Sequence, residues 1–457
     1  MRRYFSNLKL FVPIGPVVFG VLCLIVALDG ADAYTYAGVP LPWLAMFLAT
    51  PLLLVYATFS PLRAPPGLAL YLVLLCWMLG NTIVMSMRTD YSADMPAMAT
   101  TSYPTFVFLR GYAFFGFLFL SIVVFNYARQ ASPDKLLNVV TVLGILVTLY
   151  AVYVLLAQRL QLPMIPKTRF GTGEGGVIAG GETGYFGDAT ERYLFRTIGS
   201  FREPSFLGIW LIVPFFLSIA AAGGKVLNWR SIFIGLGILS TGSLTAAVAV
   251  VAGFLGALAL VQPLSKRGLK IVGAIALAAV ILGLVINTVA RMYLDTPADL
   301  SFADQYLERL ERLSTGGVQT TNRSYAFKKF IDSEFSLYGE GMGNAHLVNS
   351  RDAAVTVSFL SLYIHIWFAG GAIGLTLLLL YLFLPLLAVL LRARQNRFDN
   401  VWFVAPYVAW LVVFIANDEN LNVMISLAAG LLWARLVPLN RRQPQPLPMA
   451  AAPSPAQ

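Results

Sequence analysis

Long runs of apolar residues, separated by short polar segments, recur along the whole chain. Twelve runs are present, and most have the roughly 20 residues that a helix needs to cross the hydrocarbon core of a bilayer. The runs are Leu10–Leu28, Pro40–Phe59, Leu68–Met87, Pro104–Tyr127, Leu136–Leu156, Pro204–Ala222, Ser231–Leu239, Leu244–Val261, Ile271–Ala290, Gly371–Leu391, Val401–Ala416 and Leu421–Val437. This pattern predicts an all-α, polytopic membrane protein with about 12 transmembrane helices.

Composition supports a membrane protein and excludes several classes. The 457 residues are 58% hydrophobic and 12% charged, which is too apolar for a water-soluble multidomain enzyme. The net charge of +10 would suggest a nucleic-acid partner in a soluble protein. Here the basic residues lie in loops between spans, so no nucleic acid is expected. Two cysteines inside apolar runs and two histidines argue against a disulfide framework and a metal centre.

Charge also predicts the orientation in the membrane. Placing the N-terminus in the cytoplasm and alternating sides gathers the basic residues in one set of loops, as the positive-inside rule requires. That set is Arg2, Arg3, Lys9, Arg63, Arg129, Lys135, Lys225, Arg230, Lys266, Arg267, Lys270, Arg392, Arg394, Arg397, Arg435, Arg441 and Arg442. Asp134 and Asp399 are the only acidic residues on that side. We therefore predict that both termini are cytoplasmic.

Two apolar stretches do not fit a simple crossing. Ser231–Leu239 is too short to cross unaided, and we predict a broken or tilted helix that continues through Ser240–Ser243, packed inside protein. A crossing by Val355–Phe368 would put Arg392 and its basic neighbours outside. We expect this stretch to form a short helix that dips into the outer half of the membrane and turns at Gly370–Gly371.

The spans and loops divide the chain into six predicted parts. In order, they are transmembrane helices 1–5 (1–156), an outer loop (157–203), helices 6–9 (204–290), a larger outer loop with the dipping helix (291–370), helices 10–12 (371–437) and a disordered tail (438–457). The first loop includes a Gly-rich run from Gly171, expected to be flexible. The larger loop should contain short helices, because Phe302, Tyr306 and Leu310 recur at helical spacing and Asn322 can cap another helix.

The two outer loops carry bunched arginines. They are Arg192, Arg196 and Arg202 just before the sixth span, and Arg309, Arg312 and Arg323 in the larger loop. Guanidinium groups bind phosphate oxygens through paired hydrogen bonds and stay charged near a low-dielectric boundary. The clusters therefore suit a diphosphate attached to a lipid. The alternative is that they contact lipid head groups or pair with the nearby carboxylates, which are Glu191, Glu203, Glu308 and Glu311.

Four other ionisable residues are candidates for chemistry. Arg110 lies inside the fourth span, where a charge either faces protein and water or extends to the outer head groups. His346 lies in a Gly-broken turn expected outside the membrane, and histidine is the usual proton acceptor near neutral pH. Glu203 and Glu340 are alternative bases. Solvation of His346 and ion pairing of Glu203 are the corresponding structural interpretations, and His365 is expected to pack between helices or bind a buried polar group.

Three segments resemble those of a known family. Residues 196–208, Arg-Thr-Ile-Gly-Ser-Phe-Arg-Glu-Pro-Ser-Phe-Leu-Gly, enter the sixth span. Asn322-Arg323 and residues 337–344, Leu-Tyr-Gly-Glu-Gly-Met-Gly-Asn, lie in the larger loop, and residues 358–362 precede Gly371-Ala-Ile-Gly374. Their order and spacing resemble the O-antigen polymerase (Wzy-type) and O-antigen ligase superfamily. The likeness covers about 180 residues, each motif is short, and the many-span layout also agrees.

The resemblance implies a GT-C-like glycosyltransferase of the bacterial inner membrane, with its active site on the periplasmic face. The donor would be an oligosaccharide on undecaprenyl diphosphate, used without a cofactor, metal or nucleotide sugar. The partners would be this lipid-linked donor and the bilayer, with a chain-length regulator as a further candidate. Arg196, Arg202 and Arg323 would hold the diphosphate, with Arg192, Arg312 and Arg110 as further candidates, and His346 or Glu203 would be the base.

The resemblance alone leaves three functions open. Ligases of the superfamily, which transfer glycan to lipid A-core, carry His followed by Asn, Ser or Gln about ten residues before Gly-x-x-Gly. This chain has Leu360-Ser361 at that spacing, which favours a polymerase. A transporter of a sugar or of a lipid-linked oligosaccharide would place charges near the midplane of several spans, whereas Arg110 is almost alone there.

Overall fold

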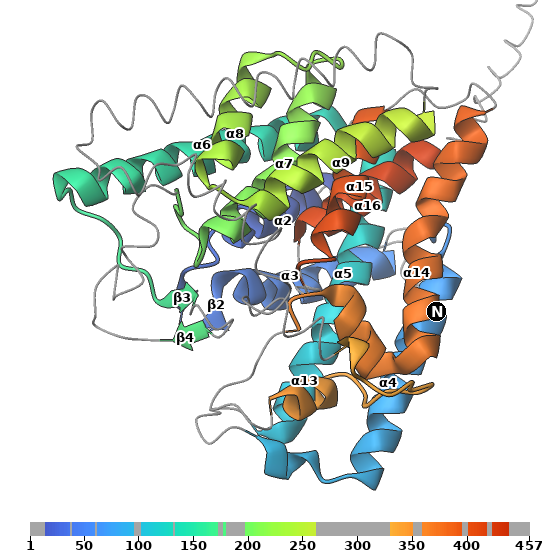
Figure 1. The fold of residues 1–457 in the computed structure, drawn as a ribbon. Coiled ribbons are helices and arrows are strands. Elements are labelled where there is room, and N and C mark those ends of the chain that lie inside the picture. Colours follow the sequence, from blue (N-terminus) through green and yellow to red (C-terminus); the bar gives the residue numbers. More distant parts are fainter. Residues whose placement is uncertain are drawn as a thin grey trace, which may run out of the picture.

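A computed structural model of the chain describes residues 14–36, 39–59, 62–95, 102–130, 133–171, 177–179, 197–261, 330–350, 359–394, 401–417 and 423–437. Helices dominate these residues (Figure 1). They are α2 (Ile14–Asp29), α3 (Leu41–Phe59), α4 (Leu68–Arg88), α5 (Tyr103–Gln130), α6 (Pro133–Leu160), α7 (Pro204–Ala221), α8 (Trp229–Ser240), α9 (Leu244–Val261), α13 (Asn344–Asn349), α14 (Leu362–Ala393), α15 (Val401–Val413), α16 (Val423–Leu436) and the 3-10 helix η1 (Tyr91–Asp94). Two short antiparallel hairpins pair β1 (Thr35–Tyr36) with β2 (Val39–Pro40), and β3 (Arg169–Gly171) with β4 (Val177–Ala179).

Several of these helices are suited to a bilayer, so the chain is a helical membrane protein. Among the described residues, six helices are long and apolar enough to cross a membrane: α3, α4, α6, α7, α9 and α14. Four shorter apolar helices, α2, α8, α15 and α16, also coincide with predicted runs. The run Ile271–Ala290 lies outside the described residues, and the total of twelve spans stays a prediction.

Helix α7 is the central helix of the bundle. Its candidate span is 78% buried, whereas that of α6 is 33% buried. It packs against α6, α8, α9 and α15, and Figure 1 shows it among these neighbours. Pro204 starts the helix at a position where the missing N–H costs nothing. Any side chain just before Pro204 is therefore held at the N-terminal end of the most buried of the candidate spans.

Loop contacts show which helix ends share a side of the bundle. The Ala33 amide donates to the Ser200 carbonyl at 2.9 Å, which joins the end of α2 to the start of α7. At the opposite helix ends, Arg230 donates to Asn138 at 3.0 Å, and the Arg63 amide donates to Asn126 at 2.8 Å. These pairings agree with the alternation used in the charge argument, in which Arg63 and Arg230 lie on one side and residues 30–36 and 197–203 on the other.

The predicted break near Ser240–Ser243 is present, but the predicted continuation of the helix through these residues is wrong. Helix α8 ends at Ser240, Gly242 has a positive φ of 59°, and α9 begins at Leu244. The hydroxyl groups explain the break, because the Thr241 Oγ1 accepts from the Ser243 amide and the Ser243 Oγ accepts from the Ala246 amide. Ser243 therefore acts as an N-cap for a new helix.

The turn predicted at Gly370–Gly371 is present as a break within α14. Gly371 has φ 63° and ψ −163°, and helical geometry resumes after it as far as Ala393. The helix preceding the break starts at Leu362 rather than Val355, and residues 351–358 lie outside the described part. Entry of the helix into the membrane stays a prediction, as do the helical pieces around Phe302 and Asn322 and the flexibility of residues 172–176, which are also outside it.

Candidate functional site

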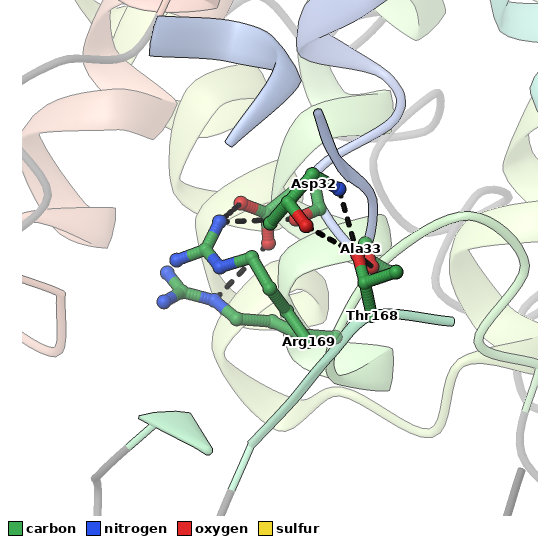
Figure 2. Close-up of polar contacts among 6 residues, drawn as sticks. Asp32, Ala33, Thr168 and Arg169 are labelled. Atoms are coloured by element: carbon green, nitrogen blue, oxygen red, sulfur yellow. Dashed lines mark hydrogen bonds and ion pairs between the residues drawn. The ribbon is translucent and has the colours of Figure 1, made fainter. Parts of the chain in front are cut away.

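Three loop segments meet at the mouth of α7. The Thr168 and Arg169 amides both donate to the Ala33 carbonyl, at 3.1 and 3.0 Å, and the Thr35 amide donates to Thr168 Oγ1 at 2.7 Å (Figure 2). Because the Ala33 amide is also bonded to Ser200, this residue fixes the loop after α6 and the loop before α7 to the end of α2. Side chains from all three loops are thereby held together.

These loops bring one carboxylate between two guanidinium groups. Asp32 Oδ1 is 2.9 Å from Arg169 Nη1, and Asp32 Oδ2 is 3.1 Å from Arg202 Nε. The Arg202 guanidinium also lies over the Phe206 ring, 4.1 Å from its centroid, in the first turn of α7. We call Asp32, Lys167, Arg169 and Arg202 the Asp32 cluster. Its guanidinium groups are oriented by ion pairs and by an aromatic face, and their side chains are 13% (Arg169) and 9% (Arg202) exposed.

Lys167 adds a third basic side chain to the cluster. Its Nζ donates to the Phe201 carbonyl at 2.7 Å, and the residue is 6% exposed. Burial lowers the pKa of Lys167 to about 7, and the attraction of Asp32 opposes this shift. The ammonium group is therefore close to half protonated near neutral pH.

A second carboxylate lies nearby. Asp29, at the end of α2, accepts from Trp210 Nε1 at 2.9 Å and from the Val423 backbone, and it interacts electrostatically with Asp32. Among the described residues the assembly thus combines three basic side chains with two acidic ones, a composition that favours an anion.

A second polar region forms where the α14 break meets the loop at 336–344. The Glu340 and Gly341 amides donate to the Phe368 and Ala369 carbonyls, both at 2.8 Å. Gly339 and Gly341 have φ values of 72° and 93°, a conformation that favours glycine. The segment thus uses its glycines to approach the broken helix closely, and it carries Glu340 with it.

Glu340 belongs to a hydrogen-bonded network at the end of α4. Tyr91 Oη donates to Glu340 Oε2 at 2.5 Å. Asn344 accepts from Tyr103 Oη at 2.7 Å and donates to Ser86 Oγ at 3.1 Å. Burial, together with the hydrogen bond and the charge of Glu340, raises the pKa of the Tyr91 hydroxyl above its ordinary value. The tyrosine is therefore a stable donor to a carboxylate.

The two histidines of the chain lie against one another. His346, on α13, and His365, in the first turns of α14, have ring centroids 4.4 Å apart, and Phe359 lies 5.1 Å from each. They are 2% and 0% exposed. The structure places His346 in a short helix rather than in the predicted turn, and its burial excludes the alternative that it is solvated. His365 packs against α13 through His346, in agreement with the prediction that it lies between helices.

The structure describes four of the predicted site residues. Arg202 is in the Asp32 cluster, and Glu203 beside it forms the N-cap of α7 and accepts from Ser205 Oγ at 3.1 Å. Arg110 is half-buried on α5. Its guanidinium group lies over the ring of Phe106, which is one turn nearer the start of the helix, at 5.2 Å from the ring centroid. His346 belongs to the histidine pair and not to the Asp32 cluster. Arg192, Arg196, Arg312 and Arg323 lie outside the described residues.

Asp32, Lys167 and Arg169 are not among the predicted site residues. Arg202 pairs with Asp32 rather than with the neighbouring Glu203, because the hydrogen bonds of Ala33 bring a residue 170 positions away into contact. Lys167 and Arg169 carry a sequence signal, since they place positive charge in a predicted outer loop against the positive-inside rule. Asp32 lies just after a span and three residues from Asp29. Acidic residues at the ends of spans are common, so its position does not mark Asp32 as a site residue.

Comparisons with protein-family models and with curated proteins find no match for this chain. The resemblance noted above therefore rests on short segments. Of these, residues 197–208, 337–344 and 371–374 lie in the described part of the chain.

Proposed function

We propose that the protein is a polysaccharide polymerase of the membrane. It would transfer a glycan from undecaprenyl diphosphate to the acceptor sugar of another lipid-linked repeat unit. The observation that supports this most directly is the Asp32 cluster, in which Arg169 and Arg202 pair with one carboxylate at the start of α7 and Lys167 donates to the neighbouring Phe201 carbonyl. This excess of buried positive charge matches a lipid diphosphate better than it matches a neutral sugar.

The proposed chemistry follows from the charge that develops during transfer. As the sugar leaves, its C1–O bond breaks and the electron pair stays on the diphosphate. Cations held at that position bind the leaving group more tightly as the bond breaks, which lowers the barrier. The acceptor hydroxyl loses its proton to a base and attacks the opposite face of C1, so the configuration inverts.

Position favours Glu203 over His346 as that base. Glu203 follows Arg202 directly, is half-buried and accepts from a hydroxyl, whereas His346 is 2% exposed and packed against His365 and Phe359. A base must lie within hydrogen-bond reach of the acceptor. Access to His346 would require the aromatic cluster around it to open.

The finer features of the proposal come from the sequence. They are twelve spans in a GT-C-like arrangement, both termini in the cytoplasm of a bacterial cell, and an active site on the periplasmic face of the inner membrane. Arg196 and Arg323, with Arg192 and Arg312, would complete the diphosphate site. Arg110 would assist from α5. A chain-length regulator would be a partner.

Arg202→Ala tests the proposal in cells that depend on this protein for their polysaccharide. We expect single repeat units and loss of long chains, with the variant still present in the membrane. Arg230→Ala is the matched control, because Arg230 lies at the opposite helix ends and bonds to Asn138. Normal chain length in the Arg202 variant would contradict the proposed role. In a deletion strain, unattached long polymer would indicate a ligase, and accumulation of a cytoplasmic precursor would indicate a transporter.

A further inference from the structure

Asp32 lies where an anion would bind in the Asp32 cluster. Each of its oxygens faces a different guanidinium group, Arg169 at 2.9 Å and Arg202 at 3.1 Å. The two arginines come from different loops, and the carboxylate contacts both: it accepts a hydrogen bond from Arg169 and makes an ion-pair contact with Arg202. Carboxylate and phosphate oxygens accept the same hydrogen bonds from guanidinium groups.

The main-chain hydrogen bonds that join the loops around Asp32 do not involve its carboxylate. The Ala33 amide and carbonyl make the hydrogen bonds to Ser200, Thr168 and Arg169 that join the loops. The Asp32 side chain is itself 15% exposed. Rotation of this side chain would therefore break two ion pairs while the three loops stayed connected.

We propose that Asp32 is an internal competitor for the diphosphate site, occupying the two guanidinium groups until a lipid-linked diphosphate displaces it. This inference rests on the proposed function and adds a means of regulation to the same site. The ligand carries more negative charge than the single carboxylate that it replaces, so the two guanidinium groups of the cluster favour the exchange. Asp32 also keeps the guanidinium groups oriented and partly neutralised when the site lacks a ligand.

Binding to the purified full-length chain in detergent tests the exchange. The probe is inorganic pyrophosphate, titrated by calorimetry at constant ionic strength. Asp32→Asn keeps the side-chain shape but removes the charge, and we expect its Kd to be at least tenfold lower than that of the unsubstituted protein. Asp90→Asn is the charge-matched control, since Asp90 caps η1 through Ser92 and is exposed. Its Kd should stay within twofold of the unsubstituted value.

A second variant, Arg202→Ala, and a second ligand, farnesyl diphosphate, separate the possible failures. An unchanged or higher Kd for Asp32→Asn overturns the competitor role, and if Arg202→Ala still abolishes binding, the diphosphate site of the proposed function stands. Pyrophosphate binding by Arg202→Ala at the unsubstituted strength overturns both. Farnesyl diphosphate should bind Asp32→Asn more tightly than pyrophosphate does, because its chain can enter apolar surroundings. Tighter binding of pyrophosphate would overturn the lipid-linked ligand.

A structural role for Asp32 makes a different prediction. If Asp32→Asn lowers the thermal midpoint, pyrophosphate should raise it again, because the anion takes the place of the carboxylate. A midpoint that pyrophosphate does not raise, or a variant that cannot be purified folded even with pyrophosphate present throughout, shows that the carboxylate is needed for the fold and overturns the proposal.

Discussion

Gly371→Ala should destabilise the protein strongly, because residue 371 joins the two halves of α14. Its φ of 63° and ψ of −163° belong to a region that only glycine enters readily, and a side chain there costs about 1–3 kcal/mol. An added Cβ would also contact the carbonyl group of Leu337 and come within 2.5 Å of the Tyr338 amide nitrogen. Overpacking of this kind typically costs about 1–3 kcal/mol.

The contacting loop cannot withdraw without a further loss. The Ala372 amide donates to the Ser336 carbonyl at 2.9 Å, and the Glu340 amide donates to the Phe368 carbonyl at 2.8 Å, on either side of Gly371. Each hydrogen bond is worth about 1 kcal/mol net. The variant should therefore lose about 2–6 kcal/mol of unfolding free energy, a large part of the total for a typical domain.

Unfolding of the detergent-solubilised protein by SDS, followed by tryptophan fluorescence, measures this loss. Trp77 Nε1 donates to the Gly370 carbonyl at 2.9 Å, so one of the eight tryptophans lies at the break. Gly80→Ala is the control, since an added Cβ on this α4 residue meets nothing within 4 Å and alanine favours a helix by about 0.5–1 kcal/mol. A Gly371→Ala variant as stable as the unsubstituted protein would refute the steric argument.

Two further substitutions test the buried polar groups. Burial lowers the pKa of Lys167 to about 7 from 10.5, so between these pH values the unfolded chain binds more protons than the folded chain and the free energy of unfolding rises with pH. Lys167→Met should remove a slope of up to about 1.4 kcal/mol per pH unit, measured by chemical unfolding between pH 7 and 9. An unchanged slope would contradict this prediction. Tyr91→Phe should lower the free energy of unfolding by about 1.5–3 kcal/mol, because it removes a hydrogen bond to the Glu340 carboxylate. The same substitution should have a much smaller effect in a Glu340→Gln background. Additive effects of the two substitutions would show that the pair is not coupled.

The sequence predicts the helices well because their signal is local. An apolar run of about 20 residues has few other stable structures in a bilayer, so Leu68–Met87 corresponds closely to α4 and Pro204–Ala222 to α7. The α14 break is also visible in the sequence, since consecutive glycines at 370 and 371 permit the positive φ that the backbone adopts.

The partners within the site are much harder to predict from sequence. Arg202 has a carboxylate beside it in Glu203, yet it pairs with Asp32, and His346 packs on His365 rather than meeting solvent. Both outcomes depend on how loops between distant helices are stacked, which no periodicity encodes. The Ser240–Ser243 turn illustrates a local limit, because the same hydroxyl groups can bond back within a helix or cap a new one.

Residues next to the ends of α15 and α16 contact the start of α14 and the end of α2. The Leu362 amide donates to the Asn417 carbonyl at 3.1 Å, at the start of the helix that carries His365. At the start of α16, the Val423 backbone donates to Asp29, which interacts with Asp32. Asn417 and Val423, which are close in sequence, thus contact the helix of His365 and the carboxylate beside Asp32, although more than 300 residues separate Asp32 from His346.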